Sequence, residues 1–160
     1  MHRLCLPLAA LIVVLCGDLP PAVAGGPSYA LVQDDASLKI RGRVFRLFGI
    51  YIPPTHRLCH SFRSPVRCGS RAALALDSKI QGFVRCEAVA RLRDGSRAAI
   101  CRTRSRDTRL GPDLDLAAYL LSQGWAIALP HAPFQYRTLE RIARAQGRGV
   151  WGFQADSIVP

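Results

Sequence analysis

Four cysteines in the body of the chain are the residues whose type and spacing most directly suggest chemistry. The sequence holds 6 cysteines, of which four lie beyond the apolar N-terminal segment: Cys59, Cys68, Cys86 and Cys101. Four cysteines allow three connectivities. The local one pairs Cys59 with Cys68 and Cys86 with Cys101, and each short loop that it closes is worth about 3 kcal/mol. The alternative is a zinc site, for which the candidate ligands are His56, Cys59, His60 and Cys68, although their spacing differs from that of a zinc knuckle.

The N-terminal residues predict export, which bears on that choice. Arg3 supplies a positive start, residues 4–16 form an apolar run, and residues 22–24 (Ala-Val-Ala) have the small side chains that a signal peptidase reads. The run is shorter than the about 20 residues that a membrane span needs. We therefore expect a signal peptide over 1–24, a linker over 25–27, and one exported domain, periplasmic or secreted, over 28–160 with no transmembrane segment. Export favours disulfides over zinc.

Arginine carries nearly all of the positive charge. Of the 22 basic residues only Lys39 and Lys79 are lysine, and the formal net charge is +11. The guanidinium group is a planar fork that suits phosphate, and so large a charge indicates an acidic partner such as nucleic acid or an anionic surface. The alternative is that the charge serves solubility alone. No feature of the sequence identifies a protein partner.

Two segments concentrate the arginines. A basic loop over 102–112 begins with Arg102 and Arg104. A helix expected over 135–146 carries a stripe on one face, opposite its apolar residues: Arg137, Arg141, Arg144 and Arg148. Such a stripe is usually a solvated helix face.

These residues must be positioned by a small set of elements. Alternation and turn signals predict strands over 29–33, 38–40, 44–50, 83–92 and 97–102, with turns at 34–37 and 93–96. Apolar periodicity predicts helices over 68–82, 114–123 and 135–146, with Asp113 as the cap of the second. If Cys86 and Cys101 oppose each other in the hairpin, their sulfurs can bond across it. Five strands with three helices indicate an α+β domain built on a barrel.

The order of several motifs resembles the thermonuclease (staphylococcal nuclease-like) family. The segments "VQDDASLKI", "VFRLFGIYIPP", "CGSRAALAL", "RDGSRAAIC", "LDLAAYLLSQGWAIA" and "LERIARAQGRGVWG" follow one another over about residues 28–152. The resemblance implies a five-stranded OB-like β-barrel with three helices, a fold that often binds oligonucleotides. It also implies calcium-dependent phosphodiester hydrolysis, in which two arginines hold the phosphate. Those arginines correspond to Arg46 and Arg97.

The acidic positions of that family are occupied by other residue types here. The two calcium-binding aspartates correspond to Ala36 and Tyr51, and the catalytic glutamate corresponds to Pro54. Calcium needs hard oxygen ligands, and hydrolysis needs a carboxylate to orient or deprotonate water. Asp34 and Asp35 are weak candidates to replace one ligand.

We therefore expect an exported thermonuclease-like domain without hydrolytic activity and without a cofactor. It would bind nucleic acid or another polyanion through Arg46 and Arg97, aided by Arg102 and Arg104. One alternative is an active calcium-dependent phosphodiesterase with an atypical metal site. A second is a structural or protein-interaction module of the cell envelope, which would use the loop 51–54 as an apolar contact.

Overall fold

The structure, a computed structural model, describes residues 27–53, 58–60, 65–104, 113–152 and 154–155, and of 58–60, 65–70 and 154–155 it describes the backbone alone. The predicted signal peptide and most of the linker lie outside these residues. So do Pro54, His56 and the greater part of the basic loop.

The main sheet has the strand order β1-β8-β9-β4-β3-β2. Its members are β1 (Ser28–Tyr29), β2 (Leu31–Val32), β3 (Leu38–Ile40), β4 (Arg43–Leu47), β8 (Phe83–Arg91) and β9 (Arg97–Thr103). All neighbours pair antiparallel except β4 and β9, which are parallel. The strand β10 (Leu114–Asp115) also pairs with β9.

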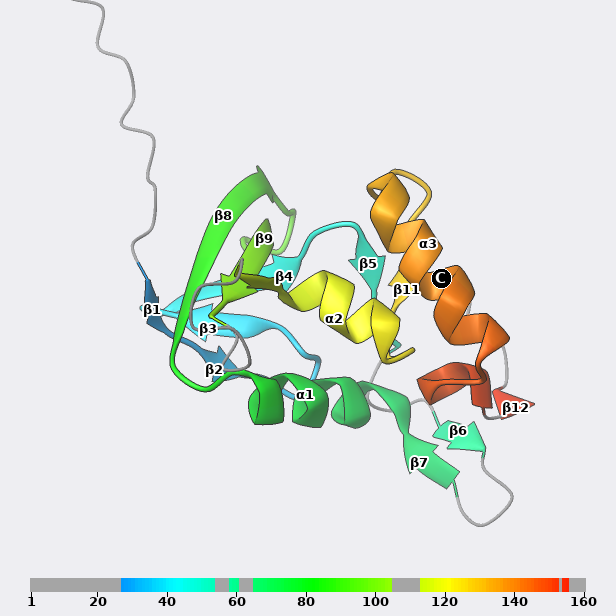
Figure 1. Ribbon diagram of the computed structural model, residues 1–160. Coiled ribbons are helices and arrows are strands. Elements are labelled where there is room, and N and C mark those ends of the chain that lie inside the picture. Colours follow the sequence, from blue (N-terminus) through cyan, green and yellow to red (C-terminus); the bar gives the residue numbers. More distant parts are fainter. Residues whose placement is uncertain (1–26, 54–57, 61–64, 105–112, 153, 156–160) are drawn as a thin grey trace, which may run out of the picture.

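The sheet curls until it nearly closes on itself (Figure 1). The strands β1 and β2 pair at its two opposite edges, yet only Ala30 separates them in the chain. The segment 28–32 therefore joins the two edges. The predicted α+β domain built on a barrel, with three helices, is confirmed at this level. The sheet is mixed because β4 and β9 run parallel.

Side chains alternate between the inside and the outside of the barrel. On β9 the side chains of Ala99, Cys101 and Thr103 are buried, whereas those between them are partly exposed. Cys86 lies directly opposite Cys101, and their sulfurs are bonded at 2.04 Å. This predicted disulfide is confirmed. The other predicted disulfide would join Cys59 and Cys68, and the structure does not describe the side chains of these two residues.

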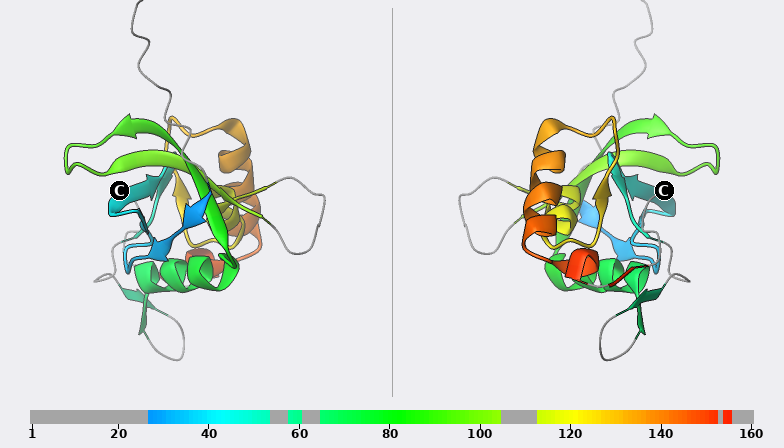
Figure 2. Two further views of the ribbon diagram at one scale, coloured as in Figure 1. Left: turned by 90° about the vertical axis from the view of Figure 1, so that its left-hand side faces the viewer. Right: turned by 90° about the vertical axis from the view of Figure 1, so that its right-hand side faces the viewer.

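The helices cover the barrel from below and from one side (Figures 1 and 2). They are α1 (Cys68–Lys79), α2 (Leu116–Ser122) and α3 (Phe134–Ala145). The buried side chains of Ala72 and Leu76 on α1 and of Leu116, Leu120 and Leu121 on α2 belong to the same core as the strands. No helix among the described residues is long and apolar enough to cross a membrane.

The cap of α2 differs from the prediction. Asp115, not Asp113, accepts hydrogen bonds from the backbone N–H groups of Ala117 and Ala118, at 2.9 and 3.1 Å. The reason is that residues 114–115 are still extended, since they pair with Thr103 and Arg102. The second oxygen of Asp115 accepts a hydrogen bond from the hydroxyl of Tyr136 on α3 at 2.7 Å. Burial and this contact raise the pKa of the Tyr136 phenol well above its ordinary value.

Short strands that the sequence patterns did not predict complete the fold. One pair joins β5 (Ile50–Tyr51) to β11 (Ile127–Ala128), and places Tyr51 opposite Ile127. A small sheet joins β6 (Leu58–His60), β7 (Pro65–Arg67) and β12 (Gln154–Ala155) beside the 3₁₀ helix η1 (Gly149–Gly152). The β5–β11 pair holds the chain that follows β4 against the segment that leads into α3.

Candidate anion-binding groove

Two hairpin turns of the same construction lie at one end of the barrel. In the first, Gln33 and Ser37 pair across a loop of residues 34–36. In the second, Leu92 and Ser96 pair across residues 93–95. The last loop residue has a positive φ in both, 59° at Ala36 and 80° at Gly95. A three-residue loop that ends in the left-handed region is a common hairpin connection, so both predicted turns form for local reasons.

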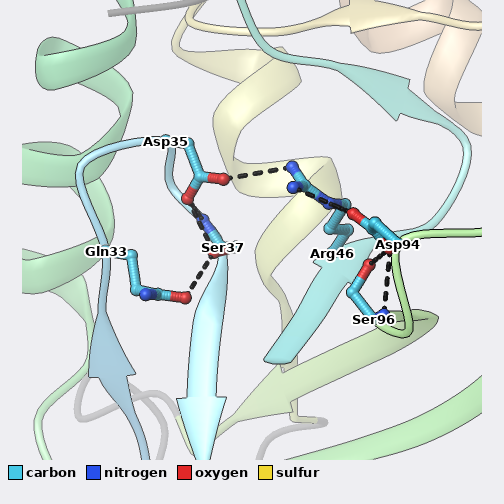
Figure 3. A network of polar contacts seen from close by, with 6 residues as sticks. All are labelled: Gln33, Asp35, Ser37, Arg46, Asp94 and Ser96. Carbon is cyan, nitrogen blue, oxygen red and sulfur yellow. Dashed lines mark hydrogen bonds and ion pairs between the residues drawn. The ribbon is translucent and has the colours of Figure 1, made fainter. Parts of the chain in front are cut away.

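An aspartate organises each turn and also faces Arg46. The Oδ1 atom of Asp35 accepts hydrogen bonds from the backbone N–H and the hydroxyl of Ser37, at 3.0 and 2.6 Å. Asp94 accepts the equivalent bonds from Ser96 at 2.9 and 2.6 Å. The Oδ2 atoms of both aspartates point at the Arg46 guanidinium, 3.1 Å from Nη1 for Asp35 and 3.3 Å from Nη2 for Asp94 (Figure 3).

Both aspartates are held in their charged form. Partial burial alone would raise the pKa of Asp35, but the hydrogen bonds from Ser37 and the charge of Arg46 outweigh it and lower that pKa. The hydrogen bonds from Ser96, with Arg46, lower the pKa of Asp94 as well. At neutral pH two carboxylates therefore face one guanidinium. Because the three groups are exposed to water, these ion pairs are weak.

A groove of about 560 Å³ runs along this end of the barrel. It contains the two aspartates and four arginines: Arg43, Arg46, Arg91 and Arg97. Unlike that of Arg46, the side chains of the other three arginines form no ion pair or hydrogen bond with another described residue. The groove therefore offers three guanidinium groups that form no ion pair with a described carboxylate.

Sequence reasoning identified Arg46 and Arg97 but missed Arg43 and Arg91. Arg91 lies directly opposite Arg97 in the β8–β9 hairpin. That neighbour relation follows from the predicted turn, since a residue just before a hairpin loop meets one just after it. Arg43 opens β4 beside Arg97, because Phe45 is the parallel partner of Arg97. That placement needed the β4–β9 pairing, which no local pattern signals.

Two of the three positions that the sequence resemblance assigns to acidic residues, Ala36 and Tyr51, lie next to this groove. A second depression of about 350 Å³ shares Asp35 and Arg46 with it and is also lined by Ala36, Tyr51 and Pro53. Fold and sequence thus bring Ala36, Tyr51 and Arg46 together. Pro54 is outside the described residues. Asp34 is exposed and lines neither depression. Over the described ranges, no three His, Cys, Asp or Glu side chains cluster as metal ligands.

Arg102 and Arg104 lie away from this groove. Arg102 lies five positions after Arg97 along the extended β9, which is about 17 Å. The side chain of Arg102 is on the outer face of β9, where Nη1 lies 3.5 Å from a carboxylate oxygen of Glu87. Together with Arg104 it lines a different depression. Arg46 and Arg97 therefore line one depression, and Arg102 and Arg104 line another.

Two arginines of the predicted stripe make contacts within the protein. Two nitrogens of Arg144 donate to Glu140 at 3.0 and 2.8 Å, and its guanidinium lies 3.9 Å from the centre of the Trp151 ring. Glu140 is buried and also accepts a hydrogen bond from the backbone N–H of Ala128. Arg148, which was predicted on this stripe, lies beyond the end of α3 and donates to the carbonyl oxygen of Ser122. These two arginines fasten α3 to its neighbours, so the stripe is more than a solvated face.

Comparison of the sequence with models of protein families found no match, and comparison with curated proteins found none either.

Proposed function

We propose that the protein binds nucleic acid, or a polyanion of similar charge, in the groove at the turn end of the barrel, and that it does not hydrolyse it. The proposal keeps the thermonuclease-like interpretation of the fold and an exported location. The nearly closed barrel, the disulfide and the placement of Ala36, Tyr51 and Arg46 around one depression support it.

The unpaired arginines of the groove carry the proposal. Arg43, Arg91 and Arg97 come from three different strands and line one concave surface. Guanidinium groups bind phosphate oxygens in a bidentate manner and keep their charge at any physiological pH. Backbone phosphates are the ligands that supply sequence-independent affinity in nucleic-acid binding.

The chemistry of the carboxylates argues for binding without hydrolysis. Phosphodiester cleavage by water needs a carboxylate that is available to a metal ion or to the attacking water. Asp35 and Asp94 instead accept hydrogen bonds from serine with one oxygen and face Arg46 with the other. The described residues therefore supply phosphate-binding groups without an uncommitted carboxylate beside them.

The test is a binding titration with a fluorescent oligonucleotide at several salt concentrations. The variant Arg43→Gln/Arg91→Gln/Arg97→Gln should lose most of the affinity. Its log–log salt slope should become shallower by about 0.7–0.9 for each phosphate that the variant no longer neutralises. Arg71→Gln, which alters an exposed arginine on α1, is the matched control and should change little. Equal losses in both variants, or binding that salt does not weaken, would contradict the proposal.

The second candidate, an active calcium-dependent phosphodiesterase, has one observation in its favour: Asp35 lines both depressions. A product analysis of the same titration, with calcium and with a chelator, separates the candidates. Cleavage by the unmodified protein that disappears with Asp35→Asn would favour the second. Intact oligonucleotide under both conditions would favour the first.

A further inference from the structure

An exposed aromatic pair lies on the outer face of the barrel, far from the groove. Tyr29 of β1 is directly opposite Phe83 of β8, and their ring centroids are 4.6 Å apart. The two residues are 74% and 53% exposed. Large aromatic side chains with this much exposed ring surface are costly to keep in water. They therefore indicate a ligand with a flat apolar face.

Three arginines adjoin this aromatic pair. Phe83 and Arg85 point to the same face of β8, and Arg102 of β9 is directly opposite Arg85. A depression of about 400 Å³ is lined by Phe83, Arg85, Arg102 and Arg104. The acids near it are Asp113, in the same lining, and Glu87, which pairs with Arg102. Among the described residues, Arg85 and Arg104 have no ion-pair partner.

This depression is separate from the groove. The strand β1 pairs with the first residues of β8. The groove lies at the last residues of β8, where the β8–β9 hairpin turns (Figure 1). No residue lines both. The two depressions can therefore be altered by substitution independently of each other.

We propose that Tyr29, Phe83, Arg85 and Arg104 form a second binding site, one that takes single-stranded nucleic acid through base stacking and phosphate contacts. This second site is independent of the groove. It rests on the proposed function only in that its ligand is also a nucleic acid. Aromatic rings next to cationic side chains are the combination that single-strand binding requires, because bases stack on the rings while the cations follow the backbone.

A duplex does not fit this combination. In a duplex the base faces are stacked on one another, so that Tyr29 and Phe83 could meet only edges and sugars. A purely apolar protein partner fits poorly as well, since binding it would bury the unpaired charges of Arg85 and Arg104 without an opposite charge. Single-stranded chains alone offer both an exposed base face and a regular series of phosphates.

The experiment uses the full mature chain and two fluorescent probes of equal length, about 12 nucleotides, which is within the range that a fold of this size covers. One probe is oligothymidylate and the other is an abasic deoxyribose-phosphate oligomer. Binding is measured for the unmodified protein and for Tyr29→Ala/Phe83→Ala, the groove variant described above, and Leu74→Ala. Leu74 is an apolar residue of α1 that is 61% exposed, and it serves as the matched control.

The aromatic variant should bind oligothymidylate about 5- to 150-fold more weakly, the range expected for losing one stacked base. Its affinity for the abasic probe should not change. The groove variant should bind both probes more weakly, and Leu74→Ala should bind both as the unmodified protein does. If the aromatic variant binds oligothymidylate normally, or weakens both probes equally, this second site is wrong even where the groove variant supports the first. If the aromatic variant alone weakens binding, the second site stands and the groove fails.

Discussion

Asp35 and Asp94, 59 residues apart in the chain, occupy equivalent places in two equivalent turns and face the same guanidinium from opposite sides. Each accepts a hydrogen bond from the serine two positions later with Oδ1 and directs Oδ2 at Arg46. Of the two arginines that the sequence resemblance assigns to phosphate, Arg46 is therefore paired with described carboxylates, whereas the Arg97 side chain is not. A phosphate that approaches Arg46 must compete with both.

The first prediction follows from this competition. Asp35→Asn/Asp94→Asn should raise the affinity for single-stranded oligonucleotides severalfold, because it frees Arg46 and removes two negative charges from the groove. An asparagine oxygen can still accept the hydrogen bonds from Ser37 and Ser96, so that the turns should persist. Anisotropy titrations at fixed salt measure the change.

The control for bulk charge is Asp77→Asn, which neutralises an exposed carboxylate on α1. It should have a much smaller effect. A rise of the same size in the control would mean that net charge, not Arg46, sets the affinity.

The second prediction concerns stability in acid. The pKa of Asp35 is lower in the folded protein than its ordinary value of 3.8. The charged form therefore adds stability above that value, and the stability is lost as the pH falls through the lower, folded-state pKa. We expect the free energy of unfolding, measured with urea, to fall between pH 7 and about pH 3 in both proteins. The fall should be smaller for Asp35→Asn than for the unmodified protein. An identical fall in both proteins would show that Asp35 does not contribute to the loss of stability in acid.

The third prediction concerns the disulfide across the hairpin. Cys86→Ala/Cys101→Ala should lower the free energy of unfolding by about 3 kcal/mol, the value for a closed loop of this size. Denaturant titrations without reductant measure it. A further loss when this variant is reduced would report a second bridge, as predicted for Cys59 and Cys68. A change much below about 1 kcal/mol would mean that packing around Cys101 compensates for the bridge.

The fourth prediction is that acids placed at the positions to which the sequence resemblance assigns them produce calcium-dependent cleavage. The set consists of Asp35→Gly, Ala36→Asp, Tyr51→Asp and Pro54→Glu. Position 36 has a φ of 59°, which aspartate tolerates better than most residues, and Asp35→Gly removes one of the two carboxylates that hold Arg46. Each restored part is worth a factor of about 10², but parts that act as a unit are not additive. Single reversions should do almost nothing, whereas the full set should cleave DNA with calcium.

The control for this set adds Arg97→Gln, which should abolish the gained cleavage. If the full set folds and binds calcium but leaves DNA intact, the assignment of positions 36, 51 and 54 to the acidic roles is wrong. Calcium-dependent cleavage by the unmodified protein would show that the site was active without them.

Local features of this protein followed from the sequence. The turns at 34–37 and 93–96 formed as predicted, because Asp-Ala-Ser and Asp-Gly-Ser satisfy their own backbone groups within a few residues. The Cys86–Cys101 bridge followed from the hairpin that one of these turns creates. Helix periodicity likewise placed α1, α2 and α3 to within a few residues at each end, since burial of one face is a local pattern.

Tertiary structure decided the rest. The prediction of Asp113 as a cap failed because β10, through its pairing with β9, extends the chain as far as Asp115. The pairing of β4 with β9 set Arg43 and Arg97 in one groove. The pairing of β4 with β3 on one side and with β9 on the other set Asp35 and Asp94 on either side of Arg46. Contacts of this kind join segments that no periodicity links, and a given strand pattern is compatible with many partners and registers. Which arginines are paired and which are left for a ligand therefore depends on the order in which the strands pair in the sheet.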